Sequence, residues 1–283
     1  MKLSVIPLRK SVRRYSDKAV EKATIDQLVA FSRETPSLGN EQIKHDFIFA
    51  QNRDWIEQLL HSYMLSYGKL IAAPCLLLPF YDDHTDVEYE FGFQVEHIVL
   101  KATELELGTC WINVDSDQIK KVLHEATSDE YEFKDIFVTP FNKQFEINLT
   151  NKQIHNAILI GYPSTKRMDR VINNAIRMEC KANARKPVES IIVNSKNKPL
   201  SSVLQKILEH AILAPSSRNR QPWRIRLTDK GFDVGGFDGH RIDLGIFIAH
   251  LKIAMQHFGK PFKITRFTEN SKDIEWFGSI PLK

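Results

Sequence analysis

The feature that most constrains the fold of this chain is a degenerate internal repeat of two short segments. Residues 35–42, TPSLGNEQ, resemble residues 214–221, APSSRNRQ, and each segment follows an amphipathic stretch. Residues 91–97 resemble residues 244–250, and each of these segments contains a glycine and opens a pattern with helical spacing. Two copies of one unit in one chain can reproduce a two-fold dimer, with a site between the copies. The alternative is a chance match between short segments.

The two copies differ in length. Their matching segments stand at different distances from each other, because the second half has no counterpart of roughly residues 55–80. We therefore predict a full-length half over residues 1–192 and a shortened half over residues 193–283, together forming an intramolecular pseudo-dimer. Helical and strand patterns mix without a regular strand–helix–strand alternation, which favours the α+β class.

Local patterns predict the elements of both halves. Helices are expected where apolar residues recur at helical spacing: 25–32, 55–67, 88–107, 115–124, 201–213 and 241–258. Strands are expected in short apolar or alternating runs: 43–50, 75–80, 157–162, 191–193, 223–227, 262–267 and 275–280. Gly108 is expected to end the long helix as a left-handed cap. The charged segment 166–186 is expected to form an extended or partly helical connector.

Positive charge is concentrated in two places. The net charge is only +4, which is too small for a typical nucleic-acid-binding protein, so we expect no nucleic-acid partner. The basic clusters lie at residues 9–14 and 181–186. A local cluster suits a bound phosphate better than a long polyanion. The alternative is that both clusters are solvated surface.

Several features bear on the cellular compartment. The longest apolar run is too short to span a bilayer, and the N-terminus has no apolar signal core. The three cysteines are an odd number and lack metal-ligand spacing. We therefore expect a cytoplasmic protein without a membrane partner or a metal site. His97 and His250 are expected to lie in the core or at an interface rather than to bind a metal.

Two distant segments offer groups that suit a flat, phosphate-bearing ligand. In residues 9–15, RKSVRRY, the side chains of Arg9, Ser11 and Arg13 fall on one side of an extended segment, and guanidinium groups match phosphate oxygens. Residues 214–223, APSSRNRQPW, offer hydroxyls and amides, and Trp223 offers an apolar wall. The alternatives are a charged surface for the first segment and an ordinary turn for the second.

In their order along the chain, these and other motifs resemble those of the nitroreductase family of flavoproteins. The matching segments are RKSVRRY at 9–15, LGTCWI at 107–112, LIGYP at 159–163, RKPVE at 185–189, and the Pro-Ser-x-x-Asn-x-Gln-Pro-Trp loop within 214–223. The first four fall in the first two-thirds of the chain, and the loop comes from the second half. The chain is most similar to the single-chain, duplicated branch of the family.

The resemblance implies that FMN binds between two halves, with the phosphate motif from one half and the loop from the other. It assigns Arg9, Ser11 and Arg13 to the FMN phosphate, with Arg185 closing over the same group. It places four loop residues against the ribityl chain and the ring edge: Pro215, Ser216, Ser217 and Asn219.

The resemblance also implies contacts to the flavin ring itself. Lys69 would reach the pyrimidine side, and the backbone of Ile112 and Asn113 would face N5. Family members usually have small residues at this last point, so Asn113 departs from the pattern. The first-half loop departs too, because Leu38 and Gly39 replace its second serine and the residue after it. The second half has no Arg-x-Ser-x-Arg motif. One composite FMN site per chain is therefore expected. The symmetry-related position in the pseudo-dimer is not expected to bind FMN.

The function implied by the resemblance is an FMN-dependent oxidoreductase that uses NAD(P)H. Nitroaromatic or quinone-type small molecules would be reduced in a ping-pong mechanism, in which the flavin does the chemistry and no catalytic side chain is required. The chain would act as a monomeric pseudo-dimer, with higher oligomers left open. One alternative is a flavin-binding or flavin-handling protein without turnover. Another is a phosphate- or nucleic-acid-binding module with a vestigial fold.

Overall fold

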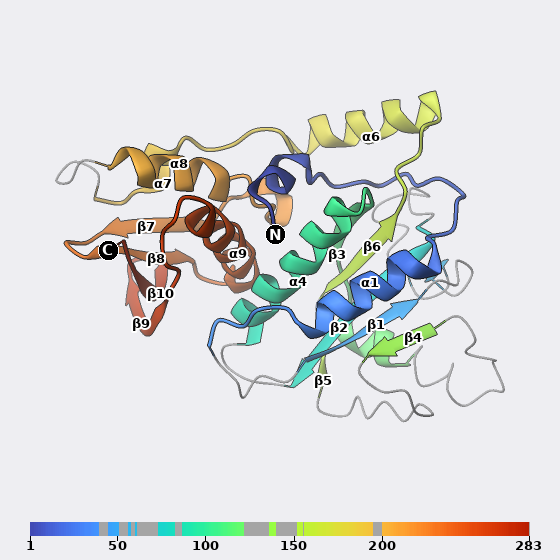
Figure 1. Cartoon of the computed structure of the whole chain (residues 1–283), viewed down its shortest axis with the longest axis horizontal. Helices are drawn as coiled ribbons and strands as arrows, with labels where there is room; N and C mark the ends of the chain where they lie inside the picture. The colour runs from blue at the N-terminus through green and yellow to red at the C-terminus, as the bar shows by residue number, and fades with distance from the viewer. Residues whose placement is uncertain are drawn as a thin grey trace.

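Two antiparallel sheets lie on either side of a central pair of long helices (Figure 1). The computed structural model describes residues 1–39, 45–50, 56–57, 60, 73–82, 87–121, 136–139, 152–154, 156–194 and 200–282. Within these residues helices and sheets mix without a regular alternation, which confirms the α+β class.

The larger sheet is built from the first half of the chain. Its strand order is β3 (Gly108–Asn113), β6 (Asn156–Gly161), β2 (Cys75–Asp82), β1 (His45–Ala50) and β4 (Ile136–Thr139), and β5 (Lys152–Gln153) pairs with β2. Every residue of β6 is buried, and so are residues 75–81 of β2. Continuous burial explains why both strands are nearly unbroken apolar runs and do not alternate.

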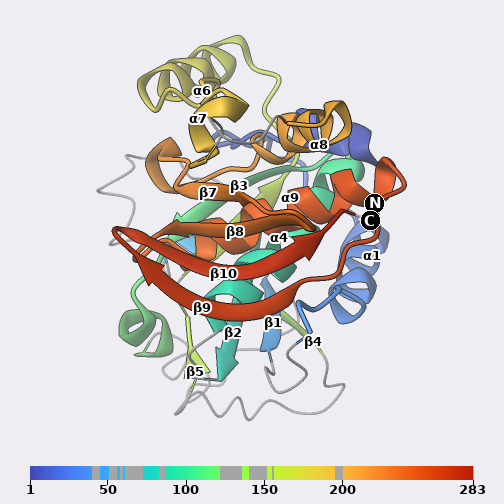
Figure 2. The ribbon, with the colours of Figure 1, turned by 90° about the vertical axis from the view of Figure 1, so that its left-hand side faces the viewer.

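The smaller sheet is built from the second half. Its order is β7 (Trp223–Leu227), β8 (Gly231–Phe237), β10 (Ile274–Pro281) and β9 (Thr265–Ser271). Figure 2 shows this sheet in front of the two central helices. The strand β8 was not predicted, because its sequence, GFDVGGF, contains three glycines and glycine is depleted in strands.

The two sheets share one topology. The path β1-β2-β6-β3 in the first half matches the path β7-β8-β10-β9 in the second, and all of these pairs are antiparallel. Residues 51–74 separate β1 from β2, whereas residues 228–230 alone separate β7 from β8. The prediction that the second half has no counterpart of residues 55–80 was therefore wrong at the C-terminal end of that range. The shortened copy lacks the segment before β2, and β8 is the counterpart of β2.

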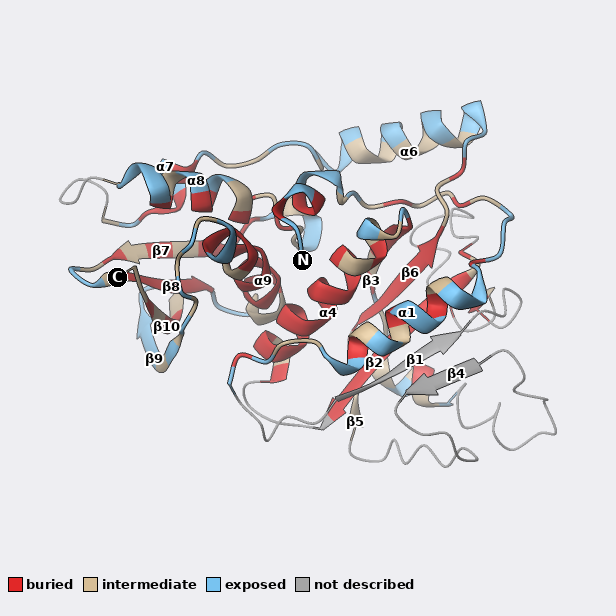
Figure 3. Cartoon of the chain, in the orientation of Figure 1, coloured by how far each residue is buried: buried red, intermediate tan, exposed pale blue. Residues whose placement is uncertain are grey.

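The central helices α4 (Val87–Glu104) and α9 (Arg241–His257) cross through equivalent glycines. A Cβ atom on Gly92 would collide with the backbone carbonyl of Ile242, and one on Gly245 would collide with that of Tyr89. Residues 89 and 92 align with residues 242 and 245 in the repeat, so the contact is reciprocal, as at a two-fold axis. Most residues of both helices are buried (Figure 3).

Shorter helices surround this centre. α1 (Lys22–Arg33) and α8 (Ser202–Ala211) occupy equivalent places, each ahead of its loop. The side chain of Ser201 caps α8 by accepting the Leu204 N–H at 3.3 Å. The N-terminal 3-10 helix η1 (Leu3–Leu8) precedes the basic segment, and residues 116–121 are helical.

The segment between the halves agrees with the prediction of a partly helical connector and differs from the prediction in one place. Most of the expected connector is a regular helix, α6 (Arg167–Glu179), none of whose residues is buried. The expected strand at 191–193 is instead the end of a short helix, α7 (Val188–Ile191), followed by a single bridge from Ile192 to Ile225. Of the expected helix over 55–67, only residues 56, 57 and 60 are described.

Gly108 does not cap the long helix. α4 ends at Glu104, the left-handed conformation falls at Glu106 with φ of 62°, and Gly108 begins β3. A Cβ atom on Gly108 would stand 2.7 Å from the Val12 side chain. The glycine is therefore needed for close packing of the N-terminal segment on β3 and not for a turn.

Candidate functional site

The N-terminal basic segment is fixed against the edge of the larger sheet. Ser11 forms a parallel bridge to Thr109 of β3, and the Val12 N–H donates to the Thr109 carbonyl at 2.8 Å. The extended backbone predicted for this segment is therefore present. Strand pairing holds Arg9, Lys10 and Ser11 at the outer edge of β3, where the halves of the chain meet.

Three arginines converge on a small inner cavity at this edge. It has a volume of about 180 Å³ and is lined by Arg9, Lys10 and Ser11 from the basic segment, by Arg177 from α6, and by Arg185 among others. The Arg9 side chain is 5% exposed. Its Nε and Nη1 atoms have no hydrogen-bond partner among the described residues, and neither has Nε of Arg185. Buried donors of this kind are costly unless an acceptor reaches them.

The arginines weaken one another's protonation. Burial lowers the pKa of Arg9, and Arg177 lowers it further, while Glu96 opposes both effects. Burial also lowers the pKa of Arg185, to about 10, with Arg9 and Arg177 adding to the effect. Arginine side chains are effectively always protonated at neutral pH, so the groups are cationic. The inner cavity therefore holds excess positive charge and unpartnered N–H groups, which together favour an anion.

One buried carboxylate lies behind this cluster. Glu96 of α4 is fully buried, and its Oε1 stands 3.9 Å from Arg9 Nε. Its two oxygens accept from His250 Nε2 at 2.9 Å and from Trp111 Nε1 at 3.0 Å. Burial lowers the pKa of His250, so the imidazole is neutral and donates through Nε2. Glu96 thus supplies part of the countercharge for Arg9, but a single carboxylate does not balance the three arginines.

Arg13 lies beside the inner cavity without lining it. Its backbone N–H donates to Asn173 Oδ1 at 2.9 Å, and its side-chain Nη1 is buried without a hydrogen-bond partner among the described residues. It lowers the pKa of Arg177, after burial, which is the larger cause. Arg13 therefore adds to the positive potential of the cluster.

Arg185 joins the cluster to the serine loop of the second half. Its Nη1 donates to Asn219 Oδ1 at 3.3 Å, and its Nη2 donates to the Leu213 carbonyl at 3.3 Å. Asn219 Nδ2 donates in turn to the carbonyls of Lys181 at 2.7 Å and Ala184 at 3.0 Å. Arg185 is thus hydrogen-bonded to the serine loop and lines the inner cavity together with Arg9, Lys10 and Ser11 of the basic segment.

The loop itself has a defined backbone. A short 3-10 turn, η3 (Ser217–Asn219), includes left-handed residues at Arg218 and Asn219, with φ of 51° and 54°. Ser216 Oγ accepts the Gln221 N–H at 2.9 Å, and the Ser217 N–H donates to Asp243 Oδ1 at 2.9 Å. Trp223 does not form the expected wall. It is fully buried and stacks on Phe247, with ring centroids 4.9 Å apart.

The first-half loop repeats this arrangement with different chemistry. The Leu38 N–H donates to Glu90 Oε2 at 2.9 Å, as that of Ser217 does to Asp243. Leu38 and Ser217, and Glu90 and Asp243, are counterparts in the repeat. Leu38 is 5% exposed and belongs to the hydrophobic core. Burial raises the pKa of Glu90, although the Leu38 N–H opposes this.

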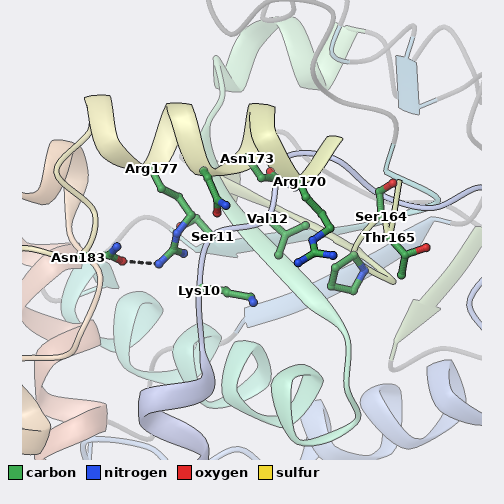
Figure 4. A pocket seen from close by; sticks show the side chains of 11 residues that line it. Lys10, Ser11, Val12, Ser164, Thr165, Arg170, Asn173, Arg177 and Asn183 are labelled. Carbon is green, nitrogen blue, oxygen red and sulfur yellow. Dashed lines mark hydrogen bonds between the residues drawn. The ribbon is translucent and has the colours of Figure 1, made fainter. Parts of the chain in front are cut away.

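A second, larger cavity lies between the basic segment and α6 (Figure 4). This outer cavity has a volume of about 480 Å³. Its lining includes Lys10 and Ser11 from the segment, Arg170 and Arg177 from α6, and Asn183. Lys10, Ser11, Arg177 and Asn183 also line the inner cavity, so the two spaces adjoin.

The remaining predicted residues are less well placed. Pro215, Ser216 and Ser217 stand in the loop beside Arg185 but line neither cavity. Ile112 and Asn113 lie at the other end of β3 from Thr109. Asn156 Nδ2 donates to the Ile112 carbonyl at 3.3 Å and to Asn113 Oδ1 at 2.7 Å. Lys69 lies outside the described residues.

Sequence analysis missed three contributors: Lys10, Arg177 and Glu96. Strict alternation put Lys10 on the opposite side from Arg9 and Ser11, yet it lines both cavities. Arg177 shares helical spacing with Arg170, Asn173 and Asn174, a signal that recognising α6 would have revealed. Glu96 lies between Val95 and His97 in a largely apolar stretch of the expected helix, which suggests a buried partner.

The described part of the chain lacks two kinds of feature. No group of three or more His, Cys, Asp or Glu side chains there is arranged to hold a metal ion. No helix in that part has the length and apolar character needed to cross a membrane.

Comparison with known proteins gives matches over both halves. A family model described as "Putative TM nitroreductase" matches residues 3–138 and again residues 132–255. A "Putative NADH dehydrogenase/NAD(P)H nitroreductase" from Archaeoglobus fulgidus is 26% identical over 119 residues, which are 40% of this chain and 67% of that protein. A protein with the same description from Methanothermobacter thermautotrophicus is 30% identical over 120 residues, 40% of this chain and 60% of that protein.

The chain thus spans about two-thirds or less of the curated relatives that it matches. A solved structure extends over the whole chain. The crystal structure of a "putative nitroreductase" from Thermotoga maritima covers 100% of this chain and 94% of its own, with a TM-score of 0.56 and 21% identity. This likeness shows the fold. The double match of the family model agrees with the shared topology of the two sheets.

Proposed function

The chain belongs to the nitroreductase family, and from this premise we propose that it is an oxidoreductase that holds FMN in one composite site. The FMN phosphate is bound by Arg9, Ser11, Arg13 and Arg185. The serine loop of the second half contacts the rest of the cofactor. The reciprocal crossing of α4 and α9 supports a pseudo-dimer, because it gives one chain the symmetry that a two-fold dimer would have.

The observation that carries the proposal is the set of unpartnered arginine N–H groups around the inner cavity. Nε and Nη1 of Arg9 and Nε of Arg185 are buried donors without acceptors among the described residues. A phosphate offers three acceptor oxygens and the charge that the cluster lacks. At about 180 Å³ the inner cavity is smaller than typical ligand pockets of roughly 300–1,000 Å³, so it suits the phosphate and not the whole cofactor.

The loop residues are suited to the polar chain and ring edge of the cofactor. Asn219 is held by donors and acceptors on three sides, which leaves its orientation fixed before a ligand arrives. The same loop contains Pro215, Ser216 and Ser217, and its Asn219 is hydrogen-bonded to Arg185. For Lys69, Ile112 and Asn113, contact with the flavin ring remains a prediction that rests on the family resemblance.

Bound FMN would supply the hydride chemistry, with NAD(P)H as reductant and a nitroaromatic or quinone as acceptor, in alternating half-reactions. The chain's own residues bind and orient. Arg9 and Arg185 neutralise the phosphate, and Glu96 holds Arg9 in place from behind. The buried packing of β3 against β6 keeps water from that side of the site. No side-chain acid or base is required in this scheme.

The first experiment is an absorbance spectrum of the purified protein with flavin quantitation. We expect about one FMN per chain, and bleaching on anaerobic addition of NADH or NADPH. Two FMN per chain would mean that the first-half loop also forms a site. A yellow protein that no nicotinamide bleaches would instead support a flavin-handling protein without turnover.

The second experiment removes one charge from the inner cavity. Arg9→Ala should weaken FMN binding by about 10- to 150-fold, because a charge-assisted hydrogen bond contributes roughly 1.5–3 kcal/mol. Titration of the flavin-free protein by fluorescence quenching measures this. Arg33→Ala is the matched control, since Arg33 is exposed at the end of α1 and lines neither cavity. Equal affinities for the two variants would exclude Arg9 from the site.

A further inference from the structure

The outer cavity has a size and a charge that the proposed FMN site does not use. Its volume of about 480 Å³ falls within the roughly 300–1,000 Å³ of ordinary ligand pockets. Among the described residues, its lining contains three cations, Lys10, Arg170 and Arg177, and no acidic side chain. No residue of the serine loop lines it, so it lies on the α6 side of the basic segment.

Within the described part of the chain, the cations of the outer cavity have no counterion in contact. Neither Lys10 nor Arg170 forms an ion pair with a described residue. The nearest acid on α6, Asp169, is already engaged, since it accepts from Ser164 Oγ at 2.6 Å and stands 3.9 Å from Arg14. Burial lowers the pKa of Arg177, and Arg13 lowers it further. An anion in the cavity would relieve this repulsion.

The polar side of α6 faces the outer cavity. An amphipathic helix on a protein surface normally buries its apolar face. Here Met168, Val171 and Met178 are 69%, 56% and 77% exposed. The polar side of the helix, with Arg170, Asn173 and Arg177, borders the outer cavity instead (Figure 4).

Specific contacts hold α6 in that orientation. Asn173 accepts the Arg13 N–H, Asp169 accepts from Ser164, and Arg177 donates to Asn183. The side chains of Arg170 and Asn174, which also line the cavity, are not engaged by any of these contacts between described residues. Several guanidinium and amide groups on one cavity wall can together donate hydrogen bonds to the oxygens of a phosphate monoester.

We propose that the outer cavity binds a second phosphate, the 2′-phosphate of NADPH, and that it makes NADPH the preferred reductant. This inference rests on the proposed function, because it names the substrate of that same reaction. NADH carries a hydroxyl at this position. It would leave Arg170 and Arg177 without an anion, and sites built for a charged group discriminate against analogues that lack it.

Steady-state kinetics of the flavin-loaded protein test the proposal. The wild type should have a kcat/KM for NADPH at least about tenfold above that for NADH. Arg170→Gln should raise KM for NADPH by a similar factor while leaving NADH kinetics and FMN content unchanged. Arg167→Gln, which removes the same charge from α6 outside the cavity, is the control and should behave as wild type. Equal use of both nicotinamides, or parallel losses for both in Arg170→Gln, would overturn the proposal.

A binding measurement separates this proposal from the proposed function. By calorimetry, 2′,5′-ADP should bind the wild type at least about tenfold more tightly than 5′-AMP, and Arg170→Gln should abolish the difference. Extraction of FAD instead of FMN would overturn the proposal, since the second phosphate would then belong to the cofactor. A protein that binds 2′,5′-ADP but no flavin would refute the proposed function and leave the phosphate cavity standing. A flavoprotein that binds 2′,5′-ADP and 5′-AMP equally would refute the phosphate cavity and leave the proposed function standing.

Discussion

The two loops of the repeat share a backbone arrangement and differ in almost everything that could bind a ligand. In each half a loop N–H donates to a carboxylate of the facing long helix, from Leu38 to Glu90 and from Ser217 to Asp243. Leu38 is in the core, whereas Ser217 is exposed. The buried Glu96 has Ala249 as its counterpart in the repeat. Both halves keep the same backbone arrangement, and in the proposed FMN site each half contributes different residues.

The largest effect is expected where the halves differ most deeply, at Glu96. Glu96→Gln should lower the free energy of unfolding by about 3–5 kcal/mol, because it leaves the buried Arg9 without its countercharge. The neutral His250 can change tautomer and accept from the new amide, so the charge is the main loss. Chemical denaturation at pH 7 measures the effect.

A double variant and a ligand sharpen this test. Arg9→Met combined with Glu96→Gln should recover most of the stability, since an apolar replacement of a buried ion pair is often neutral. Phosphate or FMN should also stabilise Glu96→Gln more than wild type, because the anion supplies the missing charge. Additive losses in the double variant would mean that Glu96 and Arg9 do not interact.

The next effect concerns what the halves share. Gly92→Ala and Gly245→Ala should each lower the free energy of unfolding by about 3 kcal/mol, because both new methyl groups would press on a backbone carbonyl that cannot move aside. Thermal or chemical unfolding checks whether the two losses are similar, as a reciprocal crossing requires. Gly236→Ala is the control, since its methyl group would meet its nearest neighbours at 3.7 Å. A large loss at one glycine alone would break the proposed symmetry.

The smallest effect is a pH dependence confined to the first-half loop. Burial raises the pKa of Glu90 above its ordinary value, so the folded protein binds this proton more tightly than the unfolded chain. The contribution of protonated Glu90 to the free energy of unfolding is fully present below about pH 4.3. It is lost as the pH rises through the pKa that Glu90 has in the folded protein. Glu90→Gln keeps an acceptor for the Leu38 N–H and should remove this loss. Unfolding curves of both proteins between pH 4 and 7 should therefore diverge as the pH rises; parallel curves would show that Glu90 does not titrate in this way.

Much of this arrangement was predictable from sequence because it depends on local patterns. The strand at 223–227 and the helix near 241–258 both followed from residue spacing. β8 was missed because its glycines hide a strand, and their reason for being there is close packing: a Cβ on Gly235 would meet the Glu275 carbonyl at 2.7 Å. Gly108 was assigned to a cap for the same reason, since sequence does not distinguish a glycine that turns from one that admits a neighbour.

The site was harder to predict than the fold. Arg9 and Ser11 follow from a motif, but Glu96 becomes relevant only when α4 is packed beneath the N-terminal segment. Trp223 was expected at the ligand and is in the core, because the alternation of β7 turns it toward Phe247. Such contacts depend on which elements face each other, and no local pattern records that.

The bond between Arg185 and Asn219 joins residues of a single polypeptide. Where such partners come from separate subunits, dilution pulls them apart, and every substitution appears twice. Here neither restriction applies. The tether keeps the local concentration of the partners constant, and each copy is free to evolve without altering the other, which is how an alanine could come to stand opposite a buried glutamate.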